Sequence, residues 1–206
     1  MYLSNFFREL PVNCRDREGP LREDILEAIH KRLFYMTEKF SRVLFFRFDL
    51  RIPRKFSPSP PDNEKLSAFL NSFTTYLNRS RIEYQYVWVR EQHSSQHPHY
   101  HLIFFLNGNL TVSPHHHLER AEKLWTNLFN NPDVTENRGL LHRCNRRADG
   151  GTQSNHILIS RNSDRFSDDI ERCFHWASYL SKMNTKGSAP HNVREWDASL
   201  IRKRPK

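Results

Sequence analysis

The sequence is poor in the features that define several large classes of protein. Its three cysteines, Cys14, Cys144 and Cys173, are odd in number and widely spaced, with no C-x-x-C pair. This pattern argues against a disulfide framework and a zinc ribbon, and it suits a reducing cytoplasm. No apolar run approaches the roughly 18 residues of a membrane span, and residues 1–8 hold no apolar core long enough for a signal peptide. We therefore expect a soluble, cytoplasmic protein with no membrane partner.

The sequence also lacks internal repeats, low-complexity blocks and a G-x-x-x-x-G-K-[S/T] motif, so the chain carries no P-loop helicase of its own. Its 206 residues, of which 37% are hydrophobic, are enough for one domain with a sizeable core. Negative charge is under-represented: 32 Lys and Arg face 23 Asp and Glu, for a formal net charge of +9. This balance predicts attraction to a polyanion, although ribosomal-type or membrane-surface binding would give the same charge.

The spacing of apolar residues predicts an alternation of helices and strands. Helical spacing is found in residues 20–40, 66–77 and 118–129, and strand patterns in residues 41–51, 84–91, 99–106, 139–144 and 155–160. The last two strands are expected to pair with each other across the turn residues 149–151. The strand at 99–106 should be central, because residues 102–106 are apolar on both faces.

This order of elements predicts an α+β fold. Strand, helix, two strands, helix and strand is the order of a split βαβ, ferredoxin-like palm. We expect about five mostly antiparallel strands, with flanking helices on one face of the sheet. The predicted domains are an N-terminal helical extension at 1–40, a main domain at 41–186 and a basic tail at 187–206.

The triplet His99-Tyr100-His101 is the strongest local signal in the chain. Alternate side chains of a strand share a face, so both imidazoles point the same way, about 7 Å apart. In a hairpin, Glu91 falls on that face if it lies opposite either histidine, whereas a one-residue slip turns it away. Two imidazoles and one carboxylate suit Mg²⁺ or Mn²⁺ better than structural zinc. The competing interpretation is a pair of surface or packing histidines.

A second set of residues lies near the C-terminus. An apolar stripe predicts a helix over residues 167–183, with Ser167 as its N-cap. Tyr179 and Lys182 are one turn apart on its flanking face, and His175 precedes Tyr179 by four residues. A phenol with its usual pKa near 10 is a weak nucleophile, which a nearby cation or a metal-polarised phosphate compensates. The alternative is a tyrosine at the edge of the core beside a solvated lysine.

Together, Glu91, His99-Tyr100-His101 and Tyr179-Leu180-Ser181-Lys182 resemble the motif set of the HUH endonucleases. Over residues 41–186 the sequence is most similar to the inovirus-type replication initiation proteins of filamentous phages and prophages, of the YagK/YfjJ type. The resemblance implies an endonuclease that nicks and rejoins single-stranded DNA at a replication origin, in a bacterial host cell. Tyr179 would form a 5′-phosphotyrosine with help from Lys182, and Glu91, His99 and His101 would bind the Mg²⁺ or Mn²⁺ ion.

The same resemblance implies partners and leaves alternatives. A separate helicase and replication machinery would be needed, and a homodimer would supply a second tyrosine, since the predicted helix carries only one. Two basic groups are candidates for binding DNA phosphates: Arg138, Arg143, Arg146 and Arg147 around the last strands, and Arg202, Lys203 and Arg204 in the tail. A single-tyrosine transposase, a non-catalytic DNA-binding regulator and, last, an RNA-binding sheet are the other functions this fold could serve.

Overall fold

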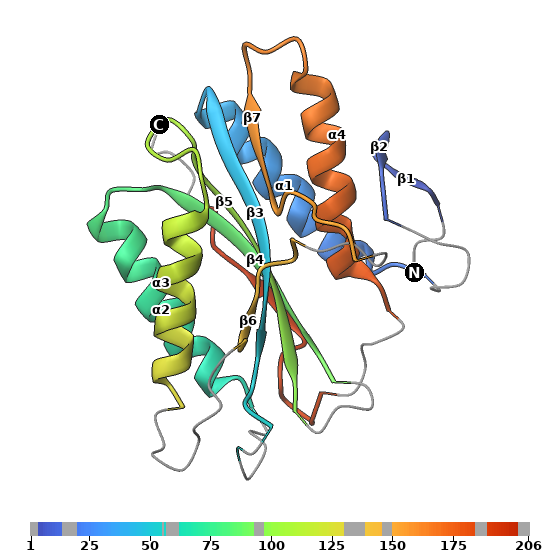
Figure 1. The fold of residues 1–206 in the computed structure, drawn as a ribbon. Coiled ribbons are helices and arrows are strands. Elements are labelled where there is room, and N and C mark those ends of the chain that lie inside the picture. Colours follow the sequence, from blue (N-terminus) through green and yellow to red (C-terminus); the bar gives the residue numbers. More distant parts are fainter. Residues whose placement is uncertain are drawn as a thin grey trace.

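In the computed structural model, helices cover both faces of a six-stranded sheet (Figure 1). The structure describes residues 4–13, 20–54, 56, 62–92, 97–129, 139–145, 150–183 and 189–201. Its elements in chain order are β1 (Phe6–Phe7), β2 (Leu10–Pro11), α1 (Glu23–Lys39), β3 (Arg42–Arg51), α2 (Glu64–Arg79), β4 (Tyr84–Glu91), β5 (His99–Asn107), α3 (His115–Asn127), β6 (Leu141–His142), β7 (His156–Ser160), α4 (Phe166–Ala177), a 3-10 turn (Ser178–Ser181) and β8 (Trp196–Ala198). The α+β fold class is confirmed.

All pairings within the sheet are antiparallel, and the main path of strands is β6-β3-β5-β4-β8. The predicted central position of β5 is confirmed, since β5 lies between β3 and β4. The predicted pairing of the last two strands is wrong. β7 pairs with the first half of β3 and β6 with its end, so the two strands follow one another along the same edge of β3. Strand β3 is ten residues long, which leaves room for both.

The two faces of the sheet bury separate hydrophobic clusters. Even-numbered residues of β3 and β5, such as Phe48 and Phe104, pack with α2 and α3. Odd-numbered residues, such as Phe45 and Phe105, pack with α1 and α4. The expectation of helices on one face is therefore wrong. Because β3 and β5 are apolar on both faces, each face needs a covering layer to exclude water.

Both ends of the chain contribute to this sheet. Helix α1 packs on the face that α4 also covers, and β8 pairs with β4. The boundaries predicted at residues 40 and 186 stay predictions. None of the helices in the described part of the chain is both long enough and apolar enough to cross a membrane.

The helix predicted for residues 167–183 is shorter than expected. It begins at Phe166, with Arg165 rather than Ser167 at the N-cap, and ends at Ala177. Tyr179 therefore lies in the 3-10 turn that follows, and Lys182 lies just after that turn. Hydroxyl groups explain the change: Oγ of Ser178 donates to the carbonyl of His175 (2.8 Å) and Oγ of Ser181 to the carbonyl of Ser178 (2.6 Å). Such bonds compete with the regular helical pattern.

The register between β3 and β5 ends at a point of very close backbone approach. Gly108 follows β5 directly, and its N–H donates to the carbonyl of Arg42 (2.9 Å). A Cβ at residue 108 would lie 2.8 Å from the carbonyl carbon of Arg42, which is closer than real Cβ contacts. Only glycine fits there without moving one of the two strands.

We expect Gly108→Val to lower the free energy of unfolding by about 3 kcal/mol, because the new side chain must push β3 and β5 apart. Gly150→Ala is the matched control. A Cβ at Gly150 meets nothing within 4 Å, and its φ of +82° should cost about 1 kcal/mol. Urea unfolding followed by circular dichroism measures both values. Equal losses in the two variants would contradict the packing argument.

Candidate active site

Charged and polar side chains replace apolar ones at one end of the sheet face that α1 and α4 cover. Arg47 and Asp49 continue the odd-numbered positions of β3, and His99 and His101 those of β5. The ladder places Asp49 opposite His101, and Glu91 of β4 opposite His99. The Glu91–His99 pairing is one of the two registers that the sequence allowed, and it keeps Glu91 on the histidine face.

His101 is held between two carboxylates. Its Nδ1 donates to Oδ1 of Asp49 at 2.7 Å, and its Nε2 faces Oε2 of Glu91 at 3.0 Å. Burial would lower the pKa of His101, but the charges and hydrogen bonds of Asp49 and Glu91 outweigh burial and raise it. Burial likewise opposes the charge of Asp49, yet its pKa falls well below the usual range, because His101, His142 and Arg47 stabilise the carboxylate. A charged buried pair of this kind needs its full set of hydrogen bonds.

The geometry around His101 also fits a metal site. Two adjacent ligands of an octahedral ion with bonds of about 2.1 Å lie about 3.0 Å apart, which is the distance between Nε2 of His101 and Oε2 of Glu91. Histidines that bind metals commonly donate their second N–H to a carboxylate, which fixes the orientation of the ring. Asp49 occupies that position. Glu91 and His101 could therefore hold a divalent ion in exchange for the proton on Nε2.

His99, the third predicted ligand, is half-buried. It lies opposite Arg51 of β3 on one side and opposite Glu91 of β4 on the other. Burial first, and the positive charge of Arg51 second, lower its pKa, so the ring is neutral near pH 7. A neutral imidazole is the form that binds metals. The structure thus places Glu91, His99 and His101 on one face at one end of the sheet.

Tyr179 lies against the face that carries Glu91, His99 and His101. Its ring is 5.8 Å from the ring of His101, edge to face. Two cations stand over the phenol: the guanidinium carbon of Arg47 is 4.0 Å from the ring centre and Nζ of Lys182 is 4.4 Å from it. Burial raises the pKa of Tyr179, and Arg47 opposes that rise through its charge and a hydrogen bond. The predicted proximity of Tyr179 to His101 and to Lys182 is present, although a 3-10 turn rather than a helix carries the phenol.

The turn that carries Tyr179 is fixed by backbone contacts with the beginning of the chain. The N–H of Asn13 donates to Oγ of Ser178 (2.8 Å), and the N–H of Arg22 donates to the carbonyl of Ser181 (2.7 Å). Leu21 and Lys182 form an isolated antiparallel bridge. These contacts set the depth at which the phenol enters the site.

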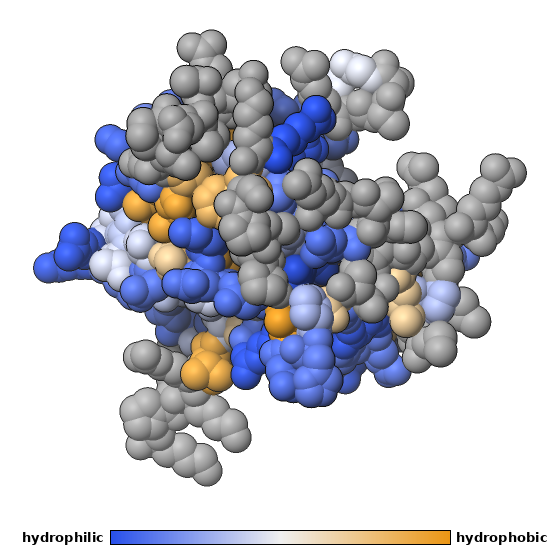
Figure 2. Space-filling view, turned by 90° about the horizontal axis from the view of Figure 1, so that it is seen from below, coloured by the Kyte–Doolittle hydropathy of each residue, from blue (hydrophilic) through white to orange (hydrophobic). Residues whose placement is uncertain are grey.

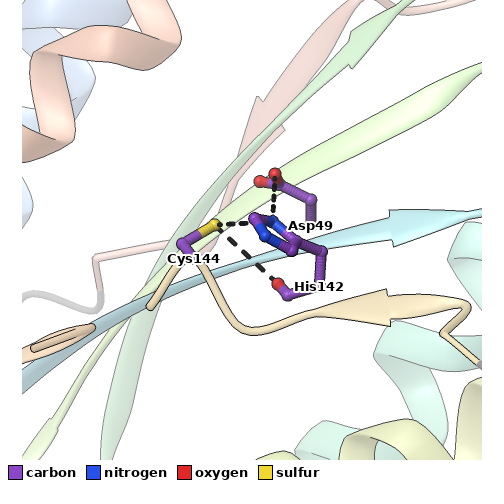
Figure 3. Close-up of side chains that lie close together, drawn as sticks. All are labelled: Asp49, His142 and Cys144. Atoms are coloured by element: carbon purple, nitrogen blue, oxygen red, sulfur yellow. Dashed lines mark hydrogen bonds and ion pairs between the residues drawn. The ribbon is translucent and has the colours of Figure 1, made fainter. Parts of the chain in front are cut away.

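A second group of ligand-type side chains adjoins the first and shares Asp49 with it. Nδ1 of His142 lies 3.4 Å from Oδ2 of Asp49 and 3.6 Å from Sγ of Cys144 (Figure 3). In the part of the chain that the structure describes, this is the group of three whose ligand atoms all lie within 4.8 Å of one another and could hold a metal ion. Burial, reinforced by the Asp49 charge, raises the pKa of Cys144 to about 12, so without a metal the thiol stays protonated.

Four residues of this region were not among the predicted site residues: Arg47, Asp49, His142 and Cys144. One signal was available for β3: charged residues at 47, 49 and 51 alternate with apolar ones inside an otherwise buried strand. Another was the H-x-C spacing of His142 and Cys144. Neither signal says that the two segments meet, because that depends on β6 pairing with the end of β3.

Of the predicted DNA-binding residues, the structure describes only Arg143, whose guanidinium pairs with Glu122 at 3.1 Å. Six of the predicted contacts lie outside the described residues: Arg138, Arg146, Arg147, Arg202, Lys203 and Arg204. In the view from below, the described surface is largely hydrophilic, with hydrophobic residues in small separate groups (Figure 2). A cavity of about 660 Å³ lies on the other side of the sheet, between α2, β4 and β8, and none of the predicted site residues lines it.

Comparisons with known proteins give one match. Residues 5–194, nearly the whole chain, match the YagK/YfjJ C-terminal domain family. A search of curated proteins found no match, and neither did a search of solved structures. The extent of the family match includes every element from β1 to β7, α4 and the turn that carries Tyr179. The chain therefore belongs to the YagK/YfjJ C-terminal domain family.

Proposed function

We propose that this chain is a replication-initiation endonuclease of the HUH type, which nicks and rejoins single-stranded DNA through a covalent bond to Tyr179. The observation that carries the proposal is the position of the phenol. Tyr179 lies edge to face with His101 at 5.8 Å, beneath Arg47 and Lys182. Residues far apart in the sequence thus meet in an arrangement suited to phosphoryl transfer.

The proposed metal ligands are Glu91, His99 and His101, and the ion is Mg²⁺ or Mn²⁺. Such an ion, when bound, would polarise the scissile phosphate and neutralise charge on its oxygens. The donor set suits it: one carboxylate oxygen and two imidazole nitrogens, with the ring of His101 oriented by Asp49.

The remaining steps belong to the side chains. The phenol of Tyr179 loses its proton to solvent and its oxygen bonds the phosphorus. The bond between phosphorus and the 3′ oxygen breaks, and that oxygen takes up a proton from solvent as a free hydroxyl. Arg47 and Lys182 stabilise the negative charge that the phenol acquires as it loses its own proton. Because the phosphoester energy is kept in the protein–DNA bond, attack by a 3′-hydroxyl reverses the step and rejoins the strand.

Other residues have supporting roles in the proposal. Lys182 is 5% exposed, so its charge acts in a site with little water, where electrostatic effects are stronger. Binding of the DNA backbone falls to basic residues such as Arg143 and those of the C-terminal tail. A separate helicase would unwind the duplex, and a second copy of the chain would supply a second tyrosine.

Replacing the nucleophile is the most direct test. Tyr179→Phe removes only the hydroxyl, so we expect no covalent protein–DNA adduct when the protein is incubated with Mn²⁺ and a labelled library of single-stranded origins. The readout is label that stays with the protein on a denaturing gel. Tyr84→Phe, on the opposite sheet face, is the control and should form adduct like the unmodified chain. An undiminished adduct in Tyr179→Phe would move the nucleophile elsewhere; adduct with hairpin ends alone would favour a transposase.

Removing the carboxylate from the metal site should weaken Mn²⁺ binding. We expect Glu91→Gln to reduce the affinity for Mn²⁺ by at least tenfold, because a neutral amide replaces the one negatively charged ligand. Electron paramagnetic resonance of free Mn²⁺ measures the affinity without any DNA. Glu83→Gln, which alters an ion pair with Lys39 at the surface, should bind Mn²⁺ normally. Unchanged affinity in Glu91→Gln would remove this residue from the site.

A further inference from the structure

We propose that Asp49, His142 and Cys144 form a second metal site, which binds Zn²⁺ or a similar borderline-soft ion and is distinct from the site of Glu91, His99 and His101. The inference does not depend on the proposed nuclease function. It rests on the distances between ligand atoms, on the ligand types and on the backbone that presents them.

The two distances that involve His142 match a tetrahedral ion, and all three ligand atoms lie within 4.8 Å of one another. With bonds of about 2.3 Å to sulfur and about 2.0–2.1 Å to nitrogen and oxygen, a tetrahedral site separates sulfur from nitrogen by about 3.6 Å and nitrogen from oxygen by about 3.4 Å. The structure has 3.6 Å between Sγ of Cys144 and Nδ1 of His142, and 3.4 Å between that nitrogen and Oδ2 of Asp49. The imidazole of His142 stands between the thiol and the carboxylate (Figure 3).

The ligand types select the ion. Sulfur ligands favour zinc-like ions over Mg²⁺ and Mn²⁺, which prefer oxygen. On binding, the S–H bond of Cys144 breaks, the sulfur bonds the metal, and the proton passes to solvent. One thiolate and one carboxylate then balance the two positive charges of the ion. The side chain of His142 is 39% exposed, which leaves an open side for a water as fourth ligand.

The backbone conformation of Cys144 is consistent with a preformed metal site. Its φ is +51°, in the left-handed region that non-glycine residues seldom occupy. The segment is fixed in this form by Gln153, whose side chain donates to the carbonyl of Cys144 at 3.1 Å and whose N–H donates to the carbonyl of Asn145 at 2.9 Å. In this conformation Sγ of Cys144 lies 3.6 Å from Nδ1 of His142.

A metal ion at this site would link the short edge strand β6 to its neighbour β3. β6 is two residues long, so its pairing with β3 has few backbone hydrogen bonds of its own. An ion held by Asp49 of β3, His142 of β6 and Cys144 would join these segments. It would also fix the carboxylate whose other oxygen, Oδ1, binds Nδ1 of His101.

Cobalt provides a probe that reports on the sulfur directly. We expect Co²⁺, added to the full-length reduced chain, to give a near-ultraviolet thiolate-to-metal charge-transfer band and visible bands of a tetrahedral ion. Added Zn²⁺ should abolish both by displacement. Cys144→Ser should lose the charge-transfer band, and His142→Ala should bind Co²⁺ at least tenfold more weakly.

Matched controls separate this site from its neighbours. Cys14→Ser and Cys173→Ala, which alter the other two thiols, should keep the band. So should Glu91→Gln, which alters the proposed nuclease site, and Tyr179→Phe, which alters its nucleophile. No charge-transfer band at saturating Co²⁺, or a full band in Cys144→Ser, would overturn the proposal. If Cys144→Ser does not fold, as judged by circular dichroism, unchanged Co²⁺ affinity in a folded His142→Ala overturns it equally.

Discussion

The buried carboxylate of Asp49 is the constraint around which this end of the protein is organised. An ionised group 8% exposed is costly unless its oxygens are paired. Here Oδ1 accepts from His101 and Oδ2 faces His142, with Arg47 close by. Each of these partners comes from a strand in register with β3 or from β3 itself. Removing the carboxylate would leave two histidines and an arginine without their common acceptor.

The register of β3 connects this constraint to the whole sheet. One edge of the strand pairs with β5 and so sets Asp49 opposite His101; the other edge pairs with β6 and so sets it opposite His142. A one-residue slip on either side would turn the partner to the other face, into the cluster covered by α2 and α3. The phenylalanines that fill the faces of β3 and β5 therefore stabilise the site at a distance, because they make any other register unfavourable.

The local patterns predicted what local chemistry determines. The order of elements followed from helical and strand spacing, and the central strand from a run that is apolar on both faces. The shared face of Glu91, His99 and His101 followed from alternation along strands. The proximity of Tyr179 and Lys182 followed from their spacing, since a 3-10 turn and a helix both bring residues three apart together. Features set by distant segments were not predictable: the second helical layer, the separate pairing of β6 and β7, and the meeting of Asp49 with His142 and Cys144. Hydroxyl groups of Ser178 and Ser181, which end α4 early, gave only a weak local signal.

The turn that carries Tyr179 has a property that follows from its attachment. It follows the last turn of α4 and is followed by Lys182, which forms a short bridge with Leu21. The N–H of Asn13 donates to Oγ of Ser178 in the same turn. The phenol is thus positioned by two stretches that lie far apart in the sequence: Asn13 and Ser178, which are in contact, are 165 residues apart. During synthesis, the first stretch must wait for the second. Tyr179 consequently reaches its place beside His101 only after the second stretch has been synthesised. A product that ends before that stretch would have the face of Glu91, His99 and His101 without the phenol.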